Sequence, residues 1–348
     1  MADQEVPPTT SAAPATSPSP PAAPAVDIDD HDSTSDVDSA YGDELASFTT
    51  SLNTSIQNHV YENGRRYHAY ESGRYFGPND EAESDRLDMA SHLSTLILGG
   101  KLFLAPIKNL QRVLDLGTGT GIWAIEMGDE HPSAEILGID LSPTQPSMVP
   151  PNVRFEIDDI EKPWTFHDNF DLIHSRFMAA AIADWPVYVA QAYKHTRPGG
   201  WCEFKDFDFS TTTPDDSLPE NSYIVMCHEN TKKCCEVLGR EYSPGPKLKE
   251  RVEAAGYENV TEIVVPVPVG IWPRDRKLKE IGAWNYTILN EGLEAICMRM
   301  WTAVLGMTAD EVVVILAKMR SEMRDKRIHF QYAYHIVYGQ KPGAAEAA

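Results

Sequence analysis

The chain has 348 residues, of which 42% are hydrophobic, and its formal net charge is −22. This length suits one large α/β domain with a tail, and the hydrophobic content is enough for a buried core. The negative charge argues against direct binding to nucleic acid or to an anionic membrane, because both require a basic surface. No hydrophobic run approaches the ~18–20 residues that span a bilayer.

The cysteine content indicates the compartment. Five cysteines, an odd number, occur in a chain that begins with polar residues and shows no signal segment. We therefore expect reduced thiols in a cytoplasmic protein, with the nucleus as the alternative, although no run of five or more Lys or Arg is present. Cys227, His228, Cys234 and Cys235 superficially suggest metal ligands, but they do not form two facing C-x₂-C pairs, so no metal is expected.

Residues 1–55 are predicted to be disordered. They begin with the Pro-, Ala- and Ser-rich stretch PPTTSAAPATSPSPPAAPA and continue with an acidic stretch, Asp27 to Glu44, that holds eight acids and no Lys or Arg. Such a composition buries too little hydrophobic surface to offset the entropy of ordering. The stretch is interpreted as a solubilising tail, with a basic protein partner as the alternative. Residues 56–342 should form the folded domain.

The first part of this domain alternates between strand-like and helix-like segments, which is typical of a parallel sheet with crossover helices. Helices are predicted at Gly121–Glu130 and Trp185–Thr196. The predicted strands are Arg112–Leu116, Glu135–Asp140, Val153–Ile157, Phe170–His174 and Gly200–Phe204. Because ligands of open α/β sheets bind beyond the carboxyl ends of the strands, the polar residues that follow these strands are candidate site residues.

The C-terminal part continues the same pattern. A helix is predicted from Pro246 in its first turn to Gly256 as its C-terminal cap. A strand is expected at Asn259–Val265, then a mostly helical segment over residues 278–325, and a final strand at Gln331–Tyr338. The chain is therefore predicted to end on the sheet.

A glycine-rich turn follows the strand Arg112–Leu116. The sequence Gly117-Thr118-Gly119-Thr120-Gly121 leads directly into a helix, so a ligand could touch bare backbone amides at a helix N-terminus. The G-x-G-x-G spacing fits the dinucleotide fingerprint poorly. Asp115, two residues before the first glycine, would repel a pyrophosphate but would suit a positively charged ligand.

The stretch VLDLGTGTGIWA resembles motif I of the class I S-adenosylmethionine-dependent methyltransferases. The resemblance implies a Rossmann-like α/β fold with a mainly parallel seven-stranded sheet, an antiparallel last strand and helices on both faces. It also implies S-adenosylmethionine as the cofactor. Asp140, which closes AEILGID, corresponds to the acid that binds the ribose hydroxyls. NVRFEIDDIEKPW corresponds to the strand with the adenine-binding acid, for which Asp159 is preferred and Asp158 is the rival, with Ile160 against the ring.

The longer resemblance is to the LaeA-like branch of fungal methyltransferases. It is carried by NGRRYHAYESGRYFGPNDEAESDRLDMASH, DDIEKPWTF, DLIHSRFM, RPGGWCEFKDFDF and KMRSEMRDKRIHFQYAYHIVYGQKP. It implies an enzyme of secondary metabolism that methylates the oxygen or nitrogen of a small-molecule intermediate. The alternative is a LaeA-like regulator that acts through protein partners and uses the fold as an interaction module. A nicotinamide-dependent oxidoreductase is a remote third reading.

The resemblance also suggests roles for residues outside the turn. Residues 56–105 would form a helical lid over the cofactor, although the same segment could be an exposed charged helix. His174 would be a catalytic base beside the methyl group or a polar cap of its strand, and Glu203 and Asp206 are weaker candidates. The segment 278–325 would cover the acceptor pocket or serve as core. The complete set of expected cofactor-binding residues is Asp115, Gly117, Thr118, Gly119, Gly121, Asp140, Leu141, Asp158, Asp159, Ile160, His174, Tyr67 and Arg74.

Overall fold

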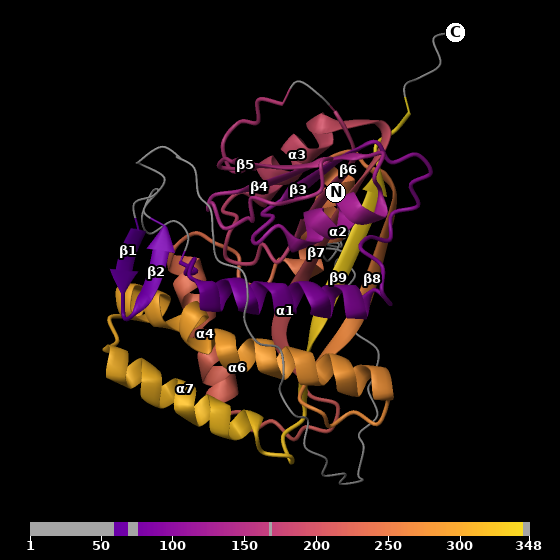
Figure 1. Cartoon of the computed structure of the whole chain (residues 1–348). Coiled ribbons are helices and arrows are strands. Elements are labelled where there is room, and N and C mark those ends of the chain that lie inside the picture. Colours follow the sequence, from indigo (N-terminus) through magenta and orange to yellow (C-terminus); the bar gives the residue numbers. More distant parts are fainter. Residues whose placement is uncertain (1–58, 69–75, 167–168, 344–348) are drawn as a thin grey trace, which may run out of the picture.

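The structure is a computed structural model that describes residues 59–68, 76–166 and 169–343. The tail predicted over residues 1–55 and the expected cofactor ligand Arg74 lie outside the described residues. In the described part, a seven-stranded sheet with the order β5-β4-β3-β6-β7-β9-β8 organises the molecule (Figure 1). Its strands are β3 (Arg112–Leu116), β4 (Glu135–Asp140), β5 (Val153–Ile157), β6 (Phe170–Arg176), β7 (Thr196–Thr212), β8 (Glu258–Val269) and β9 (Phe330–Gln340).

The expected topology of the sheet is confirmed. Strands β3 to β7 pair in parallel, whereas β9 is inserted antiparallel between β7 and β8. The first three strands coincide with the predicted ranges. The next two are longer than predicted, since β6 continues to Arg176 and β7 spans 17 residues. The carboxyl ends of β3, β4 and β6 meet at one edge of the sheet, which is where a ligand is expected.

Both faces of the sheet are covered by helices. Successive residues of a strand point to opposite faces, and in β3 Val113 packs in one hydrophobic cluster while Leu114 packs in another. Helix α2 (Ile122–Glu130) covers the Val113 side. Helices α3 (Trp185–His195) and α5 (Leu248–Ala254) cover the Leu114 side. This arrangement explains why the central strands are almost continuously hydrophobic.

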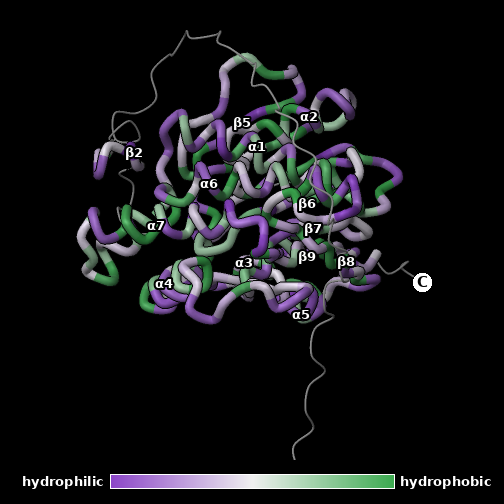
Figure 2. Tube along the Cα trace, turned by 90° about the horizontal axis from the view of Figure 1, so that it is seen from below, coloured by the Kyte–Doolittle hydropathy of each residue, from purple (hydrophilic) through white to green (hydrophobic). Residues whose placement is uncertain are grey.

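A second group of helices builds a separate core on the C-terminal strands. It consists of α1 (Glu81–Ile97), α4 (Tyr223–Val237), α6 (Arg276–Leu305) and α7 (Ala309–Met323). These helices contribute, with β7, β8 and β9, to the largest hydrophobic cluster in the described part of the chain. They lie together below the sheet in Figure 1, and in Figure 2 hydrophobic positions gather in the middle of the molecule. Helix α4 was not predicted from the sequence.

The segment before the sheet is only partly the helical segment that the sequence suggested. It starts with a hairpin of β1 (His59–Glu62) and β2 (Arg65–His68), and only then continues into α1. Arg65 forms a two-point ion pair with Asp80, the N-cap residue of α1, at 2.6 and 2.8 Å. The reason for the difference is the turn residues Asn63 and Gly64, both with positive φ, which favour a tight hairpin. The hairpin thus fixes the start of α1.

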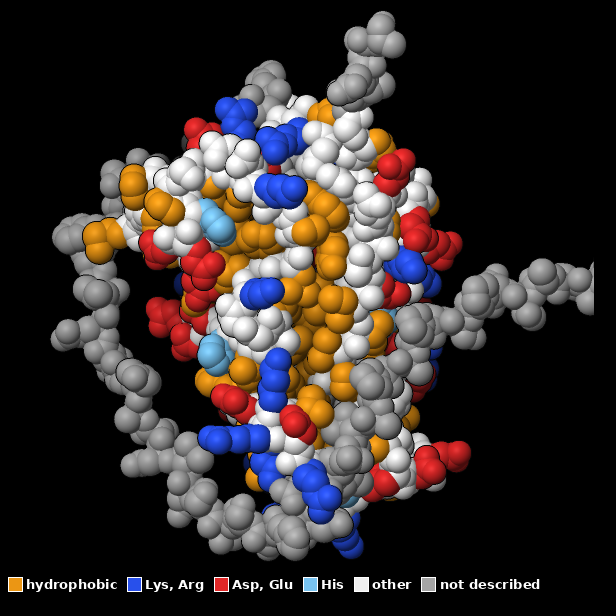
Figure 3. Space-filling model, turned by 90° about the vertical axis from the view of Figure 1, so that its right-hand side faces the viewer, with side chains coloured by type: hydrophobic (Ala, Val, Ile, Leu, Met, Phe, Trp, Pro, Cys, Tyr) orange, Lys and Arg blue, Asp and Glu red, His pale blue; other side chains and the backbone are white. Residues whose placement is uncertain are grey.

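Strand β8 forms one edge of the sheet. It carries Pro266 and Pro268, which lack the N–H needed to extend a sheet, and this composition is typical of edge strands. The right-hand side of Figure 1, where β8 lies, exposes hydrophobic side chains among scattered charges (Figure 3). Among the helices described, none combines the length and the hydrophobicity needed to cross a membrane.

Candidate functional site

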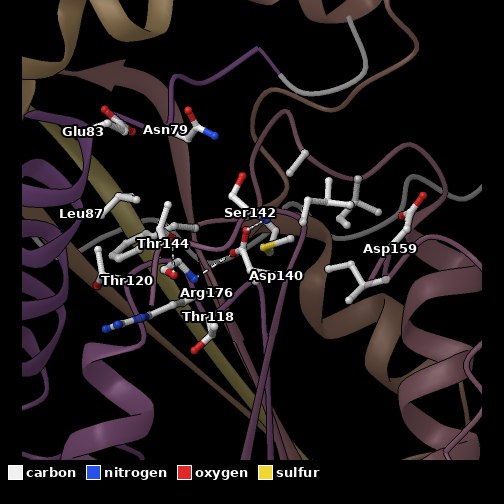
Figure 4. A pocket seen from close by; sticks show the side chains of 18 of the residues that line it. Asn79, Glu83, Leu87, Thr118, Thr120, Asp140, Ser142, Thr144, Asp159 and Arg176 are labelled. Atoms are coloured by element: carbon white, nitrogen blue, oxygen red, sulfur yellow. Dashed lines mark hydrogen bonds between the residues drawn. The ribbon is translucent and has the colours of Figure 1, made fainter. Parts of the chain in front are cut away.

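The candidate site is a cavity beyond the carboxyl ends of β3, β4 and β6, called here the first cavity. The turn after β3, the residues after β4 and β5, and the loop after β6 form most of its wall, and the start of α1 closes it (Figure 4). Of the cofactor-binding residues expected from the sequence, the structure brings eight to this wall: Gly117, Thr118, Gly119, Asp140, Leu141, Asp158, Asp159 and Ile160. Gly121, Asp115, His174 and Tyr67 are not among its lining residues.

The glycines of the turn have different tasks. Gly119 has φ +60°, and a Cβ placed there would project toward the cavity, with only Leu87 Cδ1 near it at 3.7 Å. At Gly121 a Cβ would lie 2.4 Å from the Phe155 ring, so this glycine allows the helix to pack against β5. Bare backbone therefore faces the cavity at Gly119, whereas Gly121 is required by packing.

Asp140, the last residue of β4, is tied to the turn. Its carboxylate accepts hydrogen bonds from the backbone N–H of Gly119 at 2.8 Å and of Ser142 at 3.0 Å. Burial raises the pKa of this carboxyl to about 6, and the hydrogen bonds oppose that shift. Thr144 Oγ1 and Gln145 Nε2 donate to the carbonyl oxygen of Gly119 from the other side. The turn is thus held in one shape before any ligand arrives.

The residues after β5 form the opposite wall of the first cavity. Asp159 and Ile160 are buried, whereas Asp158 is exposed, and all three line the cavity. Asp159 accepts the N–H of Glu161 at 3.0 Å, and Asp158 accepts the N–H of Asp159 at 2.8 Å. Asp159 lies across the cavity from Asn79 and Glu83 in Figure 4. Both carboxylates therefore remain compatible with the predicted adenine contact.

Asp115 and His174 lie beneath the first cavity, which differs from the expected positions. Asp115 is 2% exposed and accepts hydrogen bonds from Thr118 Oγ1 at 2.7 Å and, at the same distance, from His174 Nδ1. The imidazole is fully buried and stacks on Trp123, with ring centroids 3.6 Å apart. Burial lowers the pKa of His174 well below its ordinary value. The position of this pair suits a support for the turn and does not favour the predicted roles of a base or a direct ligand contact.

The physical reason for this difference is that successive side chains of a strand point to opposite faces of the sheet, so a polar residue near a strand end can point into a covered face. Asp115 and His174 face each other across β3 and β6 in register. Polar side chains inside a sheet are buried by the helices on both faces and must pair with each other. The sequence marked both residues as polar groups near strand ends but could not show that they pair.

Helix α1 contributes residues that the sequence analysis did not select individually for the cofactor. Glu83, Ser84 and Leu87 line the first cavity, and Glu83 is paired with Arg86 at 2.6 Å. Asn79, just before the helix, is held by a 2.8 Å hydrogen bond from its N–H to the carbonyl oxygen of Arg66 in the hairpin. These positions lie within the stretch NGRRYHAYESGRYFGPNDEAESDRLDMASH that carries the LaeA-like resemblance, but only the docking of α1 on the sheet shows which of them reach the ligand side.

Tyr67 lies away from the first cavity, in contrast to the expected place beside the cofactor. Its ring is fully buried and packs against the guanidinium of Arg299 in α6, 4.5 Å from the ring centroid. Arg299 also pairs with Glu62 of the hairpin at 3.0 Å. Tyr67 therefore attaches the hairpin to α6, because its β2 position points toward that helix.

Two arginines reach the first cavity. Arg240 is paired with Glu161 at 2.7 Å. Arg176, at the end of β6, donates from Nη2 to Ser91 Oγ at 2.8 Å, while its buried Nη1 has no hydrogen-bond partner among the residues described. Burial lowers the pKa of this guanidinium from its ordinary value, and nearby carboxylates oppose the shift. A buried donor without a partner is suited to a ligand carboxylate.

These features fit the cofactor expected from the sequence. The bare backbone at Gly119 leaves room for a close ligand, and the oxygens of Asp140 keep lone pairs for hydroxyl groups. Arg176 Nη1 is an unpartnered donor of the kind that a ligand carboxylate requires, while Arg74 lies outside the described residues. In the described ranges, no group of three or more His, Cys, Asp or Glu is arranged to hold a metal ion, and all five cysteines are buried and unbridged.

The sequence was compared with known families and proteins. The family model described as "Methyltransferase domain" matches residues 89–262. The methyltransferase pytC of Aspergillus terreus is 44% identical over 295 residues, which are 84% of this chain and 91% of that protein. The secondary metabolism regulator LAE1 of Cochliobolus heterostrophus is 36% identical and covers 84% of this chain and 98% of its own length.

A more distant relative carries a different description. The protein-methionine methyltransferase laeA of Emericella nidulans is 32% identical, covering 83% of this chain and 79% of that protein. Among solved structures, the [4+2]-cyclase SpnF matches with a TM-score of 0.45 and 17% identity, over 73% of this chain and 82% of that one.

Proposed function

The chain belongs to the class I S-adenosylmethionine-dependent methyltransferases of the LaeA-like branch, and from this premise we propose that the first cavity is its cofactor site. The proposal assigns the ribose hydroxyls to Asp140, the adenine to Asp158, Asp159 and Ile160, and the amino-acid end to the side of Gly119 and Arg176. The observation that carries it is the pair of backbone hydrogen bonds that fixes Asp140 to the bare turn at Gly119 and to Ser142.

The residues of the site act mainly by positioning. When bound, the cofactor supplies a methyl group on a positively charged sulfur, which is already a good leaving group. The turn, Asp140 and Arg176 would hold the ligand in one orientation, and α1 would exclude water from the opposite side. In well-oriented systems such positioning can contribute roughly 7–11 kcal/mol. A base is required only for an acceptor that must lose a proton, and its contribution is typically ~10²–10⁴-fold.

We propose that the acceptor is a small molecule methylated on oxygen or nitrogen. The similarity to the methyltransferase pytC, which is greater than the similarity to the regulators, supports this reading. For the compartment we propose the cytoplasm, with the nucleus as the alternative, because five unbridged cysteines suit a reducing environment. Neither nucleic acid nor a membrane is proposed as a direct partner, given the net charge of −22.

A second candidate function is regulation through protein partners. It is favoured by the names of relatives at 32–36% identity, two of which are described as a secondary metabolism regulator and a protein-methionine methyltransferase. The two functions differ in their need for the cofactor site. Capture of a defined protein partner that survives Asp140→Ala would support the fold as an interaction module.

The experiment that tests the proposed function is a calorimetric titration of the full chain with S-adenosylhomocysteine. Saturable one-to-one binding that is about tenfold to a hundredfold weaker in Asp140→Ala is the expected result. Absence of binding to the folded protein would overturn the proposal. NAD titrated under the same conditions should give no heat, and displacement of S-adenosylhomocysteine by NAD would indicate an oxidoreductase site.

A further inference from the structure

A second cavity adjoins the first and has a volume of about 240 Å³. It lies under α1, between the ends of β7 and β9 and the helices α4 and α6, and it is lined mostly by hydrophobic and aromatic side chains. Residues of the segment 278–325 form part of its wall, including Ile288 and Leu289 of α6. Both of these side chains also pack in the core, so the segment lines a cavity and contributes to the core at the same time.

The two cavities share part of their wall. Glu83, Leu87 and Phe177 line both of them. Phe177 follows directly on Arg176 and has φ +57°, a strained conformation for a residue with a large side chain. Its N–H donates to the carbonyl oxygen of Lys205 at 3.1 Å, so the ring is held at the boundary. A molecule in the second cavity would therefore meet a molecule in the first cavity at this ring.

A row of aromatic rings leads away from that boundary. Phe177 is stacked with Phe207, with centroids 6.0 Å apart, and Phe207 with Phe209 at 5.3 Å. Phe209 is stacked in turn with Tyr242 at 5.2 Å. Phe207 and Phe209 share one face of β7 because their spacing is two residues. Successive rings are inclined to each other by 12° to 29°, and a row of aromatic side chains along one wall suits a flat ligand with its own π-system.

The row ends at a cluster of three polar rings. His228 Nδ1 contacts the hydroxyl of Tyr242, and its Nε2 contacts the hydroxyl of Tyr332 at 2.7 Å. Burial lowers the pKa of His228 to about 4 and raises the pKa of both tyrosines well above the ordinary value. At neutral pH the imidazole is therefore neutral and both phenols keep their hydrogens.

One hydrogen of this cluster is left over. The imidazole carries one polar hydrogen and each phenol carries one, while the two contacts to His228 use only two of these three. The remaining hydrogen is on a tyrosine, because the ring nitrogen that receives a hydrogen bond must be the unprotonated one. Within the described ranges, neither phenol has another hydrogen-bonding neighbour. A tyrosine O–H that lines a cavity without an acceptor calls for an acceptor on the ligand.

We propose that the second cavity is the acceptor site and that it takes a flat aromatic small molecule with a carbonyl oxygen, which the Tyr242–His228–Tyr332 cluster binds. The proposal rests on the proposed function, since it needs the cofactor in the first cavity. The aromatic row places the rings of the acceptor, the cluster binds its far end, and the near end lies at Phe177. A hydroxyl or amine at the near end is then the group that faces the cofactor site.

The test uses the full chain saturated with S-adenosylhomocysteine and two probes of equal shape. One is 6-acetyl-2-naphthol, which has a carbonyl at one end, and the other is 6-ethyl-2-naphthol, which lacks it. Binding is followed by calorimetry. We expect the ketone to bind about fivefold more tightly, a typical gain for one hydrogen bond. Tyr242→Phe/Tyr332→Phe should abolish this preference and leave the affinity for S-adenosylhomocysteine unchanged.

Tyr334→Phe is the matched control. The ring of Tyr334 is buried, with its centroid 4.8 Å from that of Phe207, and its hydroxyl lies 3.1 Å from Ser94 Oγ. Because Tyr334 is outside the cluster, the preference for the ketone should persist. If the double variant does not fold, Leu289→Trp replaces it. The added ring should fill the second cavity and prevent both naphthols from binding, with the affinity for S-adenosylhomocysteine intact.

The outcomes separate the two proposals. No binding of S-adenosylhomocysteine to the wild-type chain contradicts the proposed function. Binding of S-adenosylhomocysteine without naphthol binding, or with equal affinity for both naphthols, overturns the acceptor proposal alone. It is also overturned if N-acetyl-methionine amide binds the saturated protein and neither naphthol does, because the acceptor would then be a protein side chain.

Discussion

The first and the second cavity meet at Phe177 but are assembled in opposite ways. Much of the wall of the first cavity comes from residues at or just after strand ends, such as Gly119 after β3 and Asp140 at the end of β4. The second cavity takes one or a few residues from each of many elements, so that His228 of α4 meets Tyr332 of β9 across 104 positions of the chain. The proposed cofactor site therefore depends largely on consecutive strand ends, and the proposed acceptor site does not. We expect substitutions to affect the two functions separately.

The largest effect should come from Gly119→Val, which acts on the first cavity alone. The new side chain would project into the space beside Leu87 and exclude the ligand, so we expect more than a hundredfold loss of affinity for S-adenosylhomocysteine, measured by calorimetry. Gly306→Val is the matched control, because Gly306 has φ +68° and no atom within 4 Å of an added Cβ. Both variants should lose roughly 1–2 kcal/mol of stability, but only the first should lose binding. Equal affinity of both variants for S-adenosylhomocysteine would show that the turn does not contact the ligand.

Asp140→Ala should have the next largest effect on binding. It removes the carboxylate that orders the amides of Gly119 and Ser142 and that we assign to the ribose. Hydrogen bonds to charged groups contribute about 1.5–3 kcal/mol, so the dissociation constant of S-adenosylhomocysteine should rise about tenfold to a hundredfold. Naphthol binding to the second cavity of the free protein should change little. A parallel loss in both cavities would contradict their independence.

A change in α6 should affect the second cavity first. At Gly282 an added Cβ would lie 2.0 Å from the carbonyl oxygen of Gly270, so Gly282→Ala must push α6 away from β8. We expect a loss of about 2–3 kcal/mol in the free energy of unfolding by urea, together with weaker naphthol binding.

Gly292→Ala in the same helix is the control for Gly282→Ala. The nearest atoms to its Cβ would be side-chain atoms, Arg86 Cδ at 2.8 Å and Ile296 Cδ1 at 3.5 Å, which can shift more easily than the carbonyl oxygen of Gly270, so its loss of stability should be smaller than that of Gly282→Ala. A similar loss of stability in both variants would show that α6 tolerates a Cβ at neither glycine and that the contact with the backbone of Gly270 is not the cause of the loss.

The pH dependence should distinguish binding from stability. Burial raises the pKa of the Asp140 carboxyl to about 6, so this group gains a proton as the pH falls from 7.5 to 5. The affinity for S-adenosylhomocysteine should then fall several-fold, and Asp140→Asn should flatten this dependence.

Stability should move in the opposite direction: a carboxyl whose pKa is raised by folding favours the folded state at low pH, and this advantage is lost as the pH rises through 6. Parallel changes of both quantities would contradict the assignment.

The smallest effect on binding is expected for His174→Phe. The new ring can still stack on Trp123, but Asp115 loses the hydrogen bond that His174 Nδ1 makes to it. The free energy of unfolding should fall by about 1–3 kcal/mol, while the affinity for S-adenosylhomocysteine stays within about threefold. A much larger loss of affinity would indicate that His174 contacts the ligand, as the sequence suggested.

The sequence predicted the sheet well because its signals are local. The segments ending at Leu116, Asp140 and Ile157, which are hydrophobic or alternate between hydrophobic and charged residues, give strands with the predicted bounds, and the spacing of the glycines indicated the turn after β3. The prediction was wrong where local pattern competes with tertiary contacts. The hairpin at residues 59–68 lies where a helical lid was expected, and α4 was missed because its mixed surface follows no clear motif.

The same limit applies to the roles of single residues. Asp115 and His174 carry the right chemistry for a site, but their side chains pair inside the sheet. Tyr67, expected beside the cofactor, packs against Arg299 of a helix more than two hundred residues away. Conversely, Leu87 and Arg176 reach the first cavity although the sequence analysis assigned neither of them to the cofactor. Residue type and strand position alone cannot specify which neighbour a side chain meets.

The sequence by itself determined the succession of strands along the chain, the glycine turn and the acids at the strand ends, and a parallel sheet places such strand ends at one edge. Only the tertiary structure decided which of those acids faces the ligand, and only it joined α1, α4, α6 and β9 around the second cavity. The physical reason is that strand ends are fixed by local periodicity, whereas a cavity between helices depends on how distant hydrophobic faces pack together.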